Sequence, residues 1–235
     1  MKIDTFGTCY NEERIMPYFL RHYLQYGDVY ISDNYSTDNT QKIVEEMGGH
    51  IEKFNTNDQY DEITLQNIRT NCWKKSTADW VIVCDSDEFI YHENLIDILQ
   101  NTNATLIIPE GYNMISDKFP TTDGQIYDEV KMGIFSENYC KPIIFKPSQI
   151  PNINFRAGSH FADPIGNVII DDKSGIKLLH MKHMSKDYLI ERYKLYHYRM
   201  SDLTKYHKFG IEYTWDIEKI STDFDDKFNS RQIVI

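Results

Sequence analysis

The chain has 235 residues, with 36 Asp or Glu against 25 Lys or Arg, so its formal net charge is −11. This charge argues against nucleic acid as the main partner. No apolar run approaches the roughly 20 residues of a membrane helix, and residues 1–5 have no signal-peptide pattern. The four cysteines have no regular spacing, which favours reduced thiols, and we therefore expect a cytoplasmic protein.

The first hundred residues alternate between apolar strands and amphipathic helices. We expect strands at residues 2–8, 28–32, 50–54 and 80–84, and helices at about 11–26, 40–47 and 63–75. A polar turn follows each strand. This alternation predicts an α/β fold with a doubly wound, mostly parallel sheet and helices on both faces.

The pattern is less regular after residue 88. We expect a short helix at 95–99, strands at 105–109, 142–146, 167–170 and 176–180, and a tyrosine-rich helix at 186–200. Residues 110–134 are rich in turn signals and are expected to be mainly loop. The residues after 201 give no strong signal.

Two carboxylates follow the most apolar of the expected strands. Residues 80–84 are a β-branched, wholly apolar run, and Asp85 and Asp87 come directly after it. Burying unpaired charges is costly, so a positive group or water must lie beside them. Ligands bind at the carboxyl ends of the strands in open α/β sheets. A divalent cation that holds a ligand's phosphates explains the pair economically.

The sequence contains three motifs: Cys-Tyr-Asn-Glu-Glu at 9–13, Asp-Asn-x-Ser-x-Asp-x-Thr at 33–40, and Asp-Ser-Asp-Glu-Phe at 85–89. Together they resemble the nucleotide-diphosphosugar glycosyltransferases of the GT-A fold, in particular their family-2-like branch, and the third is a form of the DxD motif. Each motif follows an expected strand. Arg69 matches the family's Arg-Asn pair in part, because Asn71 stands in place of the adjacent Asn. The resemblance covers about residues 1–200.

The resemblance implies a single domain over residues 1–200, with a nucleotide-binding half at about 1–100 and an acceptor-binding half at about 101–200. Residues 201–235 would be a helical or irregular extension. The implied donor is a nucleotide sugar, with a UDP-sugar favoured. Its nucleotide-binding residues would be Thr8, Tyr10, Glu12, Asp33, Asn34, Arg69, Asp85 and Ser86.

Roles within this set follow from the chemistry of the side chains and from the family likeness. Tyr10 would stack on the base, and Asp33 or Asn34 would hydrogen-bond its edge. By likeness Asp85 would lie near the ribose, and Asp87 would hold Mn²⁺ or Mg²⁺, with Asp85 and His180 as further ligands of the metal. His180 is matched to a family histidine in the segment 180–188, although a hydrogen-bonded histidine at a strand end explains it equally well.

The catalytic base is left open by the sequence. Segment 156–164 resembles a Gly-x-His loop of relatives, which makes Asp163 and His160 the candidates. Glu110 and Asp128 of the turn-rich stretch are less favoured alternatives. The family's Glu-Asp pair is missing here. Asp163 precedes a proline and also fits a turn residue.

We therefore expect a metal-dependent glycosyltransferase, inverting by family analogy, that transfers a hexose or deoxyhexose from a UDP-type donor to a hydroxyl of a glycan, lipid-linked or protein acceptor. One alternative is a catalytically inactive glycan-binding or scaffold domain. A haloacid-type phosphatase needs Thr or Val where Phe89 stands, and a nucleotidyltransferase needs a glycine-rich phosphate loop that the chain lacks.

The middle of the chain is its one basic part. Residues 141–199 carry ten Lys and Arg against five Asp and Glu. This block could contact an anionic membrane where lipid-linked acceptors reside, which would place the protein peripherally at the inner face of a membrane. A solvated helix face or an acceptor cleft is the alternative.

Overall fold

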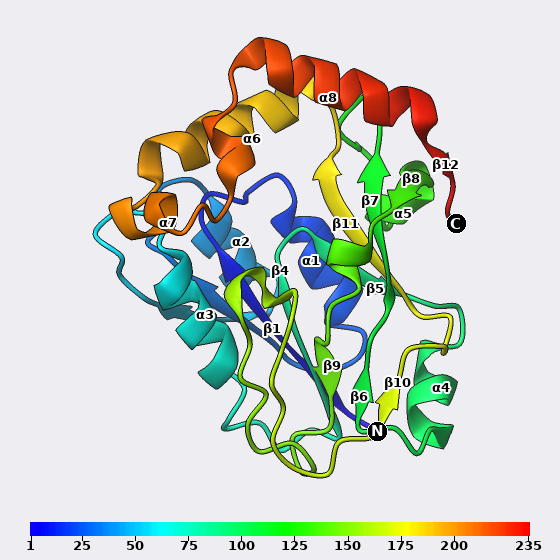
Figure 1. Ribbon diagram of the computed structural model, residues 1–235. Helices are drawn as coiled ribbons and strands as arrows, with labels where there is room; N and C mark the ends of the chain where they lie inside the picture. Colours follow the sequence, from blue (N-terminus) through cyan, green and yellow to red (C-terminus); the bar gives the residue numbers. More distant parts are fainter.

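The first of two β-sheets has the strand order β10–β6–β9–β4–β1–β2–β3 in the computed structural model, which describes residues 1–235 (Figure 1). Its strands are β1 (Ile3–Cys9), β2 (Val29–Asp33), β3 (His50–Lys53), β4 (Trp80–Asp85), β6 (Leu106–Ile107), β9 (Ile144–Phe145) and β10 (Ile170–Asp171). β1 pairs in parallel with β2 and β4, and β2 with β3. The expected α/β fold is confirmed, with β9 antiparallel between β4 and β6.

The connections of the parallel strands are α1 (Met16–Tyr23), α2 (Thr40–Glu46) and α3 (Glu62–Asn71). β1 is buried along its whole length, because helices and loops cover both faces of the sheet. α1 begins five residues later than expected, because Asn11 takes a left-handed conformation (φ 51°) that keeps the preceding turn out of the helix. Pro17 then occupies the first turn of α1, where its missing N–H is tolerated.

The second sheet, in the order β12–β8–β7–β11–β5, was not expected from the sequence. Its strands are β5 (Glu88–Tyr91), β7 (Glu110–Ile115), β8 (Met132–Phe135), β11 (Lys177–His183) and β12 (Gln232–Ile233). β7, β8 and the short helix α5 (Ile126–Glu129) correct the expectation of a loop at 110–134. β7 and β8 contain Gly, Asn and partly exposed residues, so their apolar pattern is weak.

The C-terminal helices α6 (Lys186–Arg199), α7 (Asp202–Tyr206) and α8 (Ile217–Ser230) gather at one end of the molecule, at the top of Figure 1. Helix α4 (Leu95–Asn101) lies at the opposite end. Short 3₁₀ turns are η1 (Glu137–Tyr139), η2 (Ala157–Ser159) and η3 (Ile211–Thr214). Ile220 and Phe224 of α8 pack with Leu189 and Tyr193 of α6 in a small second core. The segment after residue 201 is thus packed onto the rest of the fold.

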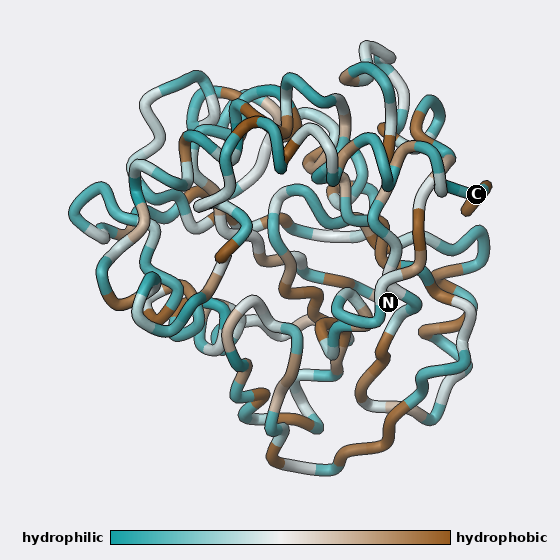
Figure 2. The backbone as a smooth tube through the Cα atoms, turned by 45° about the horizontal axis from the view of Figure 1, so that its top comes forward, coloured by the Kyte–Doolittle hydropathy of each residue, from teal (hydrophilic) through white to brown (hydrophobic).

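One large buried cluster joins the two sheets. It includes Phe6 of β1, Val83 of β4 and Leu178 of β11. Figure 2 shows hydrophobic stretches running through the strands in the middle of the molecule, while the loops at its left edge are largely hydrophilic. Phe19 of α1 meets Phe89 of β5 edge to face, with 6.1 Å between ring centroids. This packing fixes the strand ends from which the polar residues below project.

Candidate functional site

A cavity of about 330 Å³ lies where the carboxyl ends of β1 and β4 meet the C-terminal segment. Of the residues expected from the sequence, its lining contains Thr8, Tyr10, Glu12, Asn34, Arg69, Asp85, Ser86, Asp87, His160 and His180. Asp33 and Asp163 lie outside the lining. Residues from six separate parts of the chain therefore converge on one space.

Asp85, at the end of β4, is held by positive and neutral donors. Arg69 donates to its Oδ1 from Nε at 3.1 Å and from Nη2 at 2.8 Å, and the Thr8 hydroxyl donates to the same oxygen at 3.0 Å. The Lys141 ammonium lies 3.9 Å from Oδ2. Burial alone would raise the pKa of Asp85, but Arg69 and Lys141 outweigh it and hold that pKa below its usual range. The charge of Asp85 is thus balanced by the protein itself.

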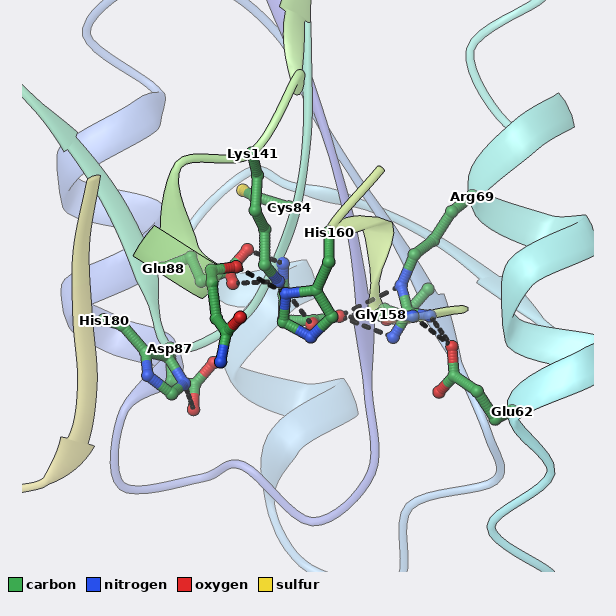
Figure 3. A network of polar contacts seen from close by, with 12 residues as sticks. Glu62, Arg69, Cys84, Asp87, Glu88, Lys141, Gly158, His160 and His180 are labelled. Carbon is green, nitrogen blue, oxygen red and sulfur yellow. Dashed lines mark hydrogen bonds and ion pairs between the residues drawn. The ribbon is translucent and has the colours of Figure 1, made fainter. Parts of the chain in front are cut away.

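Glu62 extends this network from α3 to the turn η2. Its Oε1 accepts hydrogen bonds from Arg69 Nη1 at 2.9 Å and from the Gly158 N–H at 2.7 Å, and its Oε2 accepts one from the Tyr60 hydroxyl at 2.9 Å. Glu62 is 2% exposed, so these bonds replace those that water would make. Figure 3 shows Glu62 and Arg69 on one side of the site, with Gly158 between them and His160.

Lys141 is a site residue that the sequence did not reveal. It is 2% exposed, and its Nζ lies 2.5 Å from Glu88 Oε1. The other oxygen of Glu88 accepts the backbone N–H of Asp85 at 3.0 Å. Burial works to lower the pKa of Lys141, but the neighbouring Glu88 and Asp85 raise it, so the ammonium stays charged.

Asp87 and His180 lie in contact in the lining of the cavity, on the left of Figure 3, with 3.3 Å between Oδ2 and Nε2. His180 Nδ1 lies 2.8 Å from Asn113 Oδ1, and Tyr139 stacks on the imidazole at 4.0 Å. An amide oxygen only accepts, so Nδ1 carries a ring hydrogen, and Nε2 is the ring atom that faces the carboxylate. Burial would raise the pKa of Asp87, but His180 lowers it below the usual value.

This pair fits two ligands of a divalent cation. Ligand atoms at about 2.1 Å from an ion and at right angles lie about 3 Å apart. No group of three His, Cys, Asp or Glu side chains is arranged to hold a metal ion in this structure, so the expected set of Asp85, Asp87 and His180 stays a prediction. The physical reason is that the Asp85 carboxylate is turned towards Arg69 and Lys141.

One end of the cavity is built around Tyr10 and Asn34, two of the residues expected to bind a nucleotide. The Arg199 guanidinium lies 3.1 Å from the centroid of the Tyr10 ring, and the Tyr10 hydroxyl donates to Asp58 at 3.3 Å. The amide of Asn34 is hydrogen-bonded to the Thr56 hydroxyl at 2.8 Å. Asp33 is fully buried and accepts the Ser36 N–H at 3.0 Å, so its carboxylate shapes the turn after β2.

Glu12 is tied to the C-terminal half of the chain. Its carboxylate is in close contact with the Arg192 guanidinium of α6, and Arg192 also donates to the carbonyl oxygen of Asn11 at 2.6 Å. Both charged side chains are buried. This ion pair holds α6 against the loop that follows β1.

His160 and Asp163 differ sharply in their surroundings. His160 Nδ1 donates to the carbonyl oxygen of Asn138 at 2.5 Å, which leaves the Nε2 lone pair free. Burial, with a contribution from Lys141, lowers the pKa of His160 to about 4, so the ring is neutral near pH 7. Asp163 is 62% exposed at its side chain, and Arg156 binds both of its oxygens at 2.9 and 3.0 Å.

Gly158 is needed for the position of His160. It has φ of +64°, and a Cβ at this glycine would come within 2.6 Å of the His160 ring. A larger residue would therefore displace the imidazole.

The C-terminal segment closes the cavity, which sequence patterns did not indicate. Residues 208–213 supply part of the lining, including Glu212 and Tyr213. Glu212 accepts a hydrogen bond from Lys182 at 3.0 Å, and the Lys182 ammonium lies 4.8 Å from the Tyr193 ring and 5.0 Å from that of Tyr213. Burial would raise the pKa of Glu212, but Lys182 lowers it. The boundary expected at residue 200 thus runs through the wall of the site.

Much of the basic block at 141–199 is paired with carboxylates within the fold. The pairs are Lys141 with Glu88, Arg156 with Asp163, Lys182 with Glu212, Lys186 with Asp225, Arg192 with Glu12 and Arg199 with Asp58. These contacts give the local positive charge a structural role. No helix of the structure combines the length and apolar character that crossing a membrane requires.

The chain is similar to known proteins in its family and in its fold. The family model for glycosyl transferase family 2 matches residues 8–162. Among solved structures, S. aureus TarS covers 98% of this chain at 16% identity and a TM-score of 0.50, and this chain covers 44% of TarS. No curated protein matches the chain.

Two further similar structures are complexes with ligands. TarS 1–349 in complex with UDP-GlcNAc covers 98% of this chain, which covers 73% of it, at 15% identity and a TM-score of 0.45. Glucosyl-3-phosphoglycerate synthase from Mycobacterium tuberculosis, with Mn²⁺, UDP and glucosyl-3-phosphoglycerate, covers 48% of this chain at 15% identity and a TM-score of 0.35, with 44% of that protein covered. The similarity to full-length TarS concerns the fold of this chain alone. Because the family model spans more than half of the chain, from the end of β1 to the turn that carries His160, this protein belongs to glycosyl transferase family 2 and has the GT-A fold.

Proposed function

We propose that this protein transfers a hexose or deoxyhexose from a UDP-type donor to a hydroxyl of a glycan, lipid-linked or protein acceptor, with Mn²⁺ or Mg²⁺ between Asp87 and His180. The observation that carries the proposal is the 3.3 Å approach of these two side chains beside Asp85. A carboxylate and an imidazole nitrogen this close are held together by a proton or a cation between them. Asp87 lies just beyond the carboxyl end of β4, where ligands of α/β sheets bind.

The nucleotide would lie over the ends of β1 and β2. Asn34 offers amide hydrogen-bonding groups to the base edge, and the Tyr10 ring offers a face on which the base can stack once the Arg199 guanidinium moves. At the ribose, Oδ1 of Asp85 is occupied by Arg69 and Thr8. The Oδ2 atom is thus the acceptor available to a ribose hydroxyl.

The diphosphate would lie between this end and the Asp87–His180 pair. A bound divalent cation would act there as a Lewis acid on the leaving diphosphate. Asp87 contributes an anionic oxygen, and His180 contributes a nitrogen whose orientation Asn113 and Tyr139 fix. Such preorganisation avoids the cost of turning the ligands during the reaction.

His160 is the proposed base for the acceptor. Its Nε2 would take the proton of the acceptor hydroxyl as the hydroxyl oxygen forms a bond to the sugar C1 and the bond from C1 to the diphosphate breaks. A single displacement of this kind inverts the configuration at C1. A neutral imidazole that lines the cavity suits this role better than Asp163, which is exposed and bound by Arg156.

Asp85 is unsuited to the nucleophile's role in a phosphatase. Three donors converge on its Oδ1, and two cations lower its pKa, so the carboxylate is a weak nucleophile.

The test is UDP release from UDP-glucose, UDP-galactose and UDP-GlcNAc, with Mn²⁺ or with EDTA, in the wild type and in Asp87→Asn. We expect release with at least one donor, only with Mn²⁺, and its loss in the variant. Hydrolysis of an aryl phosphate that disappears in Asp85→Asn would favour the phosphatase instead. Release of UDP at equal rates with EDTA would contradict the metal-dependent account.

A further inference from the structure

A second cavity of about 520 Å³ lies on the C-terminal part of the molecule, between α6, η3 and the start of α8. Four of its lining residues are aromatic: Tyr193, Tyr198, Tyr213 and Trp215. Tyr193 and Tyr213 also line the first cavity. The two cavities thus share a wall made of the same two rings.

The aromatic rings of this groove are unevenly buried. Tyr193 is 3% exposed and Tyr213 is partly buried, so these two form a fixed floor. Tyr198, in contrast, is 84% exposed. A ring left so open contributes little to folding, and stacking on it would remove apolar surface from water. Trp215 is partly exposed, with the Lys219 ammonium 4.3 Å from its ring centroid.

Polar groups stand around these rings. His197 Nδ1 donates to the Tyr213 carbonyl oxygen at 3.0 Å, which leaves its Nε2 as an acceptor. Lys194 and Glu218 add a donor and an acceptor of opposite charge, and both are exposed. Aromatic faces bordered by mixed donors and acceptors suit a sugar ring, whose C–H face packs on aromatic rings while its hydroxyls hydrogen-bond.

We propose that this groove binds a glycan, namely the sugar units of the acceptor that lie beyond the reacting hydroxyl. The proposal rests on the proposed function, since the shared wall of Tyr193 and Tyr213 places the groove beside the candidate transfer site. A phosphate-bearing ligand suits the groove less well, because Asp216 and Glu218 lie in its lining. An apolar peptide would cover the exposed charges of Lys194 and Glu218 without offering them partners.

The experiment measures binding of unmodified oligosaccharides to the full chain. The probes are a glycan array, followed by titration of the tetrasaccharide that binds best and of its monosaccharide unit. We expect the tetrasaccharide to bind more tightly than the monosaccharide. In Tyr198→Ala, loss of one stacking ring should weaken tetrasaccharide binding about three- to tenfold. The matched control is Tyr206→Ala, which removes a tyrosine that is 80% exposed on α7 and outside the groove, and should bind as the wild type does.

The outcomes separate this proposal from the proposed function. Wild-type binding of UDP with Mn²⁺, measured in the same series, tests the donor site alone. If UDP fails to bind but the tetrasaccharide binds, and Tyr198→Ala weakens tetrasaccharide binding, the groove proposal is supported and the proposed transfer function is contradicted. If UDP binds but no array glycan does, or if Tyr198→Ala and Tyr206→Ala bind equally well, the groove proposal is overturned.

Discussion

Arg69 donates two hydrogen bonds to one carboxylate oxygen, Oδ1 of Asp85, from Nε at 3.1 Å and from Nη2 at 2.8 Å. The first residue belongs to α3 and the second ends β4. Arg69 is 4% exposed, so water does not compete for these bonds. The arrangement fixes the orientation of Asp85 and leaves its second oxygen without a hydrogen bond from another side chain.

Arg69→Lys should therefore weaken both folding and nucleotide binding. Lysine keeps the charge but has a single ammonium in place of the planar fork, so at least one bond to Asp85 or Glu62 is lost. We expect the free energy of unfolding in urea to fall by about 1–3 kcal/mol. UDP affinity should fall as well. Arg14→Lys is the control, because Arg14 forms an exposed pair with Glu191. Equal effects of the two substitutions would contradict the role of Arg69.

The ion pair of Lys141 with Glu88 gives a second prediction. Lys141→Met leaves the buried Glu88 carboxylate without its cation, which should cost about 3–5 kcal/mol of the free energy of unfolding. Adding Glu88→Gln removes the stranded charge, and the double variant should regain part of that loss. Urea denaturation of the single and double variants measures the coupling. Lys186→Met, which breaks a more exposed pair with Asp225, should cost about 0–1 kcal/mol. A cost for Lys141→Met no larger than this would refute the prediction.

His160 and Asp163 form a matched pair for testing the base. His160→Asn should lower kcat by about 10²- to 10⁴-fold. Asp163→Asn should leave kcat close to the wild-type value, because Asp163 lies outside the cavity and is bound by Arg156. Because the pKa of His160 is about 4, the kcat/KM of the wild type should decrease only as the pH falls towards 4. A large loss in Asp163→Asn with a small one in His160→Asn would reverse the assignment.

The surroundings of His183 in β11 lead us to expect that the free energy of unfolding decreases in acid. It is 3% exposed, and neither ring nitrogen has a hydrogen-bond partner. Burial, with Lys227 nearby, lowers the pKa of His183 well below its usual value. The unfolded chain takes up a proton below about pH 6.5 and the folded chain does not, so stability is lost as pH falls below that value.

The measurement for His183 compares urea unfolding at pH 7.5 and pH 5.5. Over this interval the histidine should account for about 1.4 kcal/mol of lost stability. His183→Leu should lack this contribution, so the wild type should lose more stability than the variant does. Parallel losses in both proteins would show that other groups cause the acid sensitivity.

Local sequence patterns predicted the part of the site that lies on regular α/β units. A buried apolar strand followed by Asp85 and Asp87 is a signal contained within about ten residues, and the strand ends of β1 and β4 do meet at the cavity. The second sheet was missed because β7 and β8 alternate poorly between apolar and polar residues. Period-two patterns identify a strand only where one face is consistently apolar.

Other site residues depend on contacts between distant parts of the chain. Lys141 meets Glu88 across 53 positions of sequence, and from the sequence alone it counted as one more basic residue of a charged block. Glu212 and Tyr213 lie in a segment without a periodic signal, and packing of α8 on α6 brings them over the cavity. Asp163 and His160 fit the base equally well in sequence. Only the structure shows that Arg156 binds the first and that burial neutralises the second.

The most direct test of the account is isothermal titration of UDP into the wild type and into Asp87→Asn, each with Mn²⁺ and with EDTA. Asp87 and His180 lie 3.3 Å apart, and the account places the cation between them. We predict that Mn²⁺ tightens UDP binding at least tenfold in the wild type, by about 1.4 kcal/mol or more, and has no effect in Asp87→Asn. Equal UDP affinity of the wild type with Mn²⁺ and with EDTA, or an unchanged Mn²⁺ effect in Asp87→Asn, would contradict it.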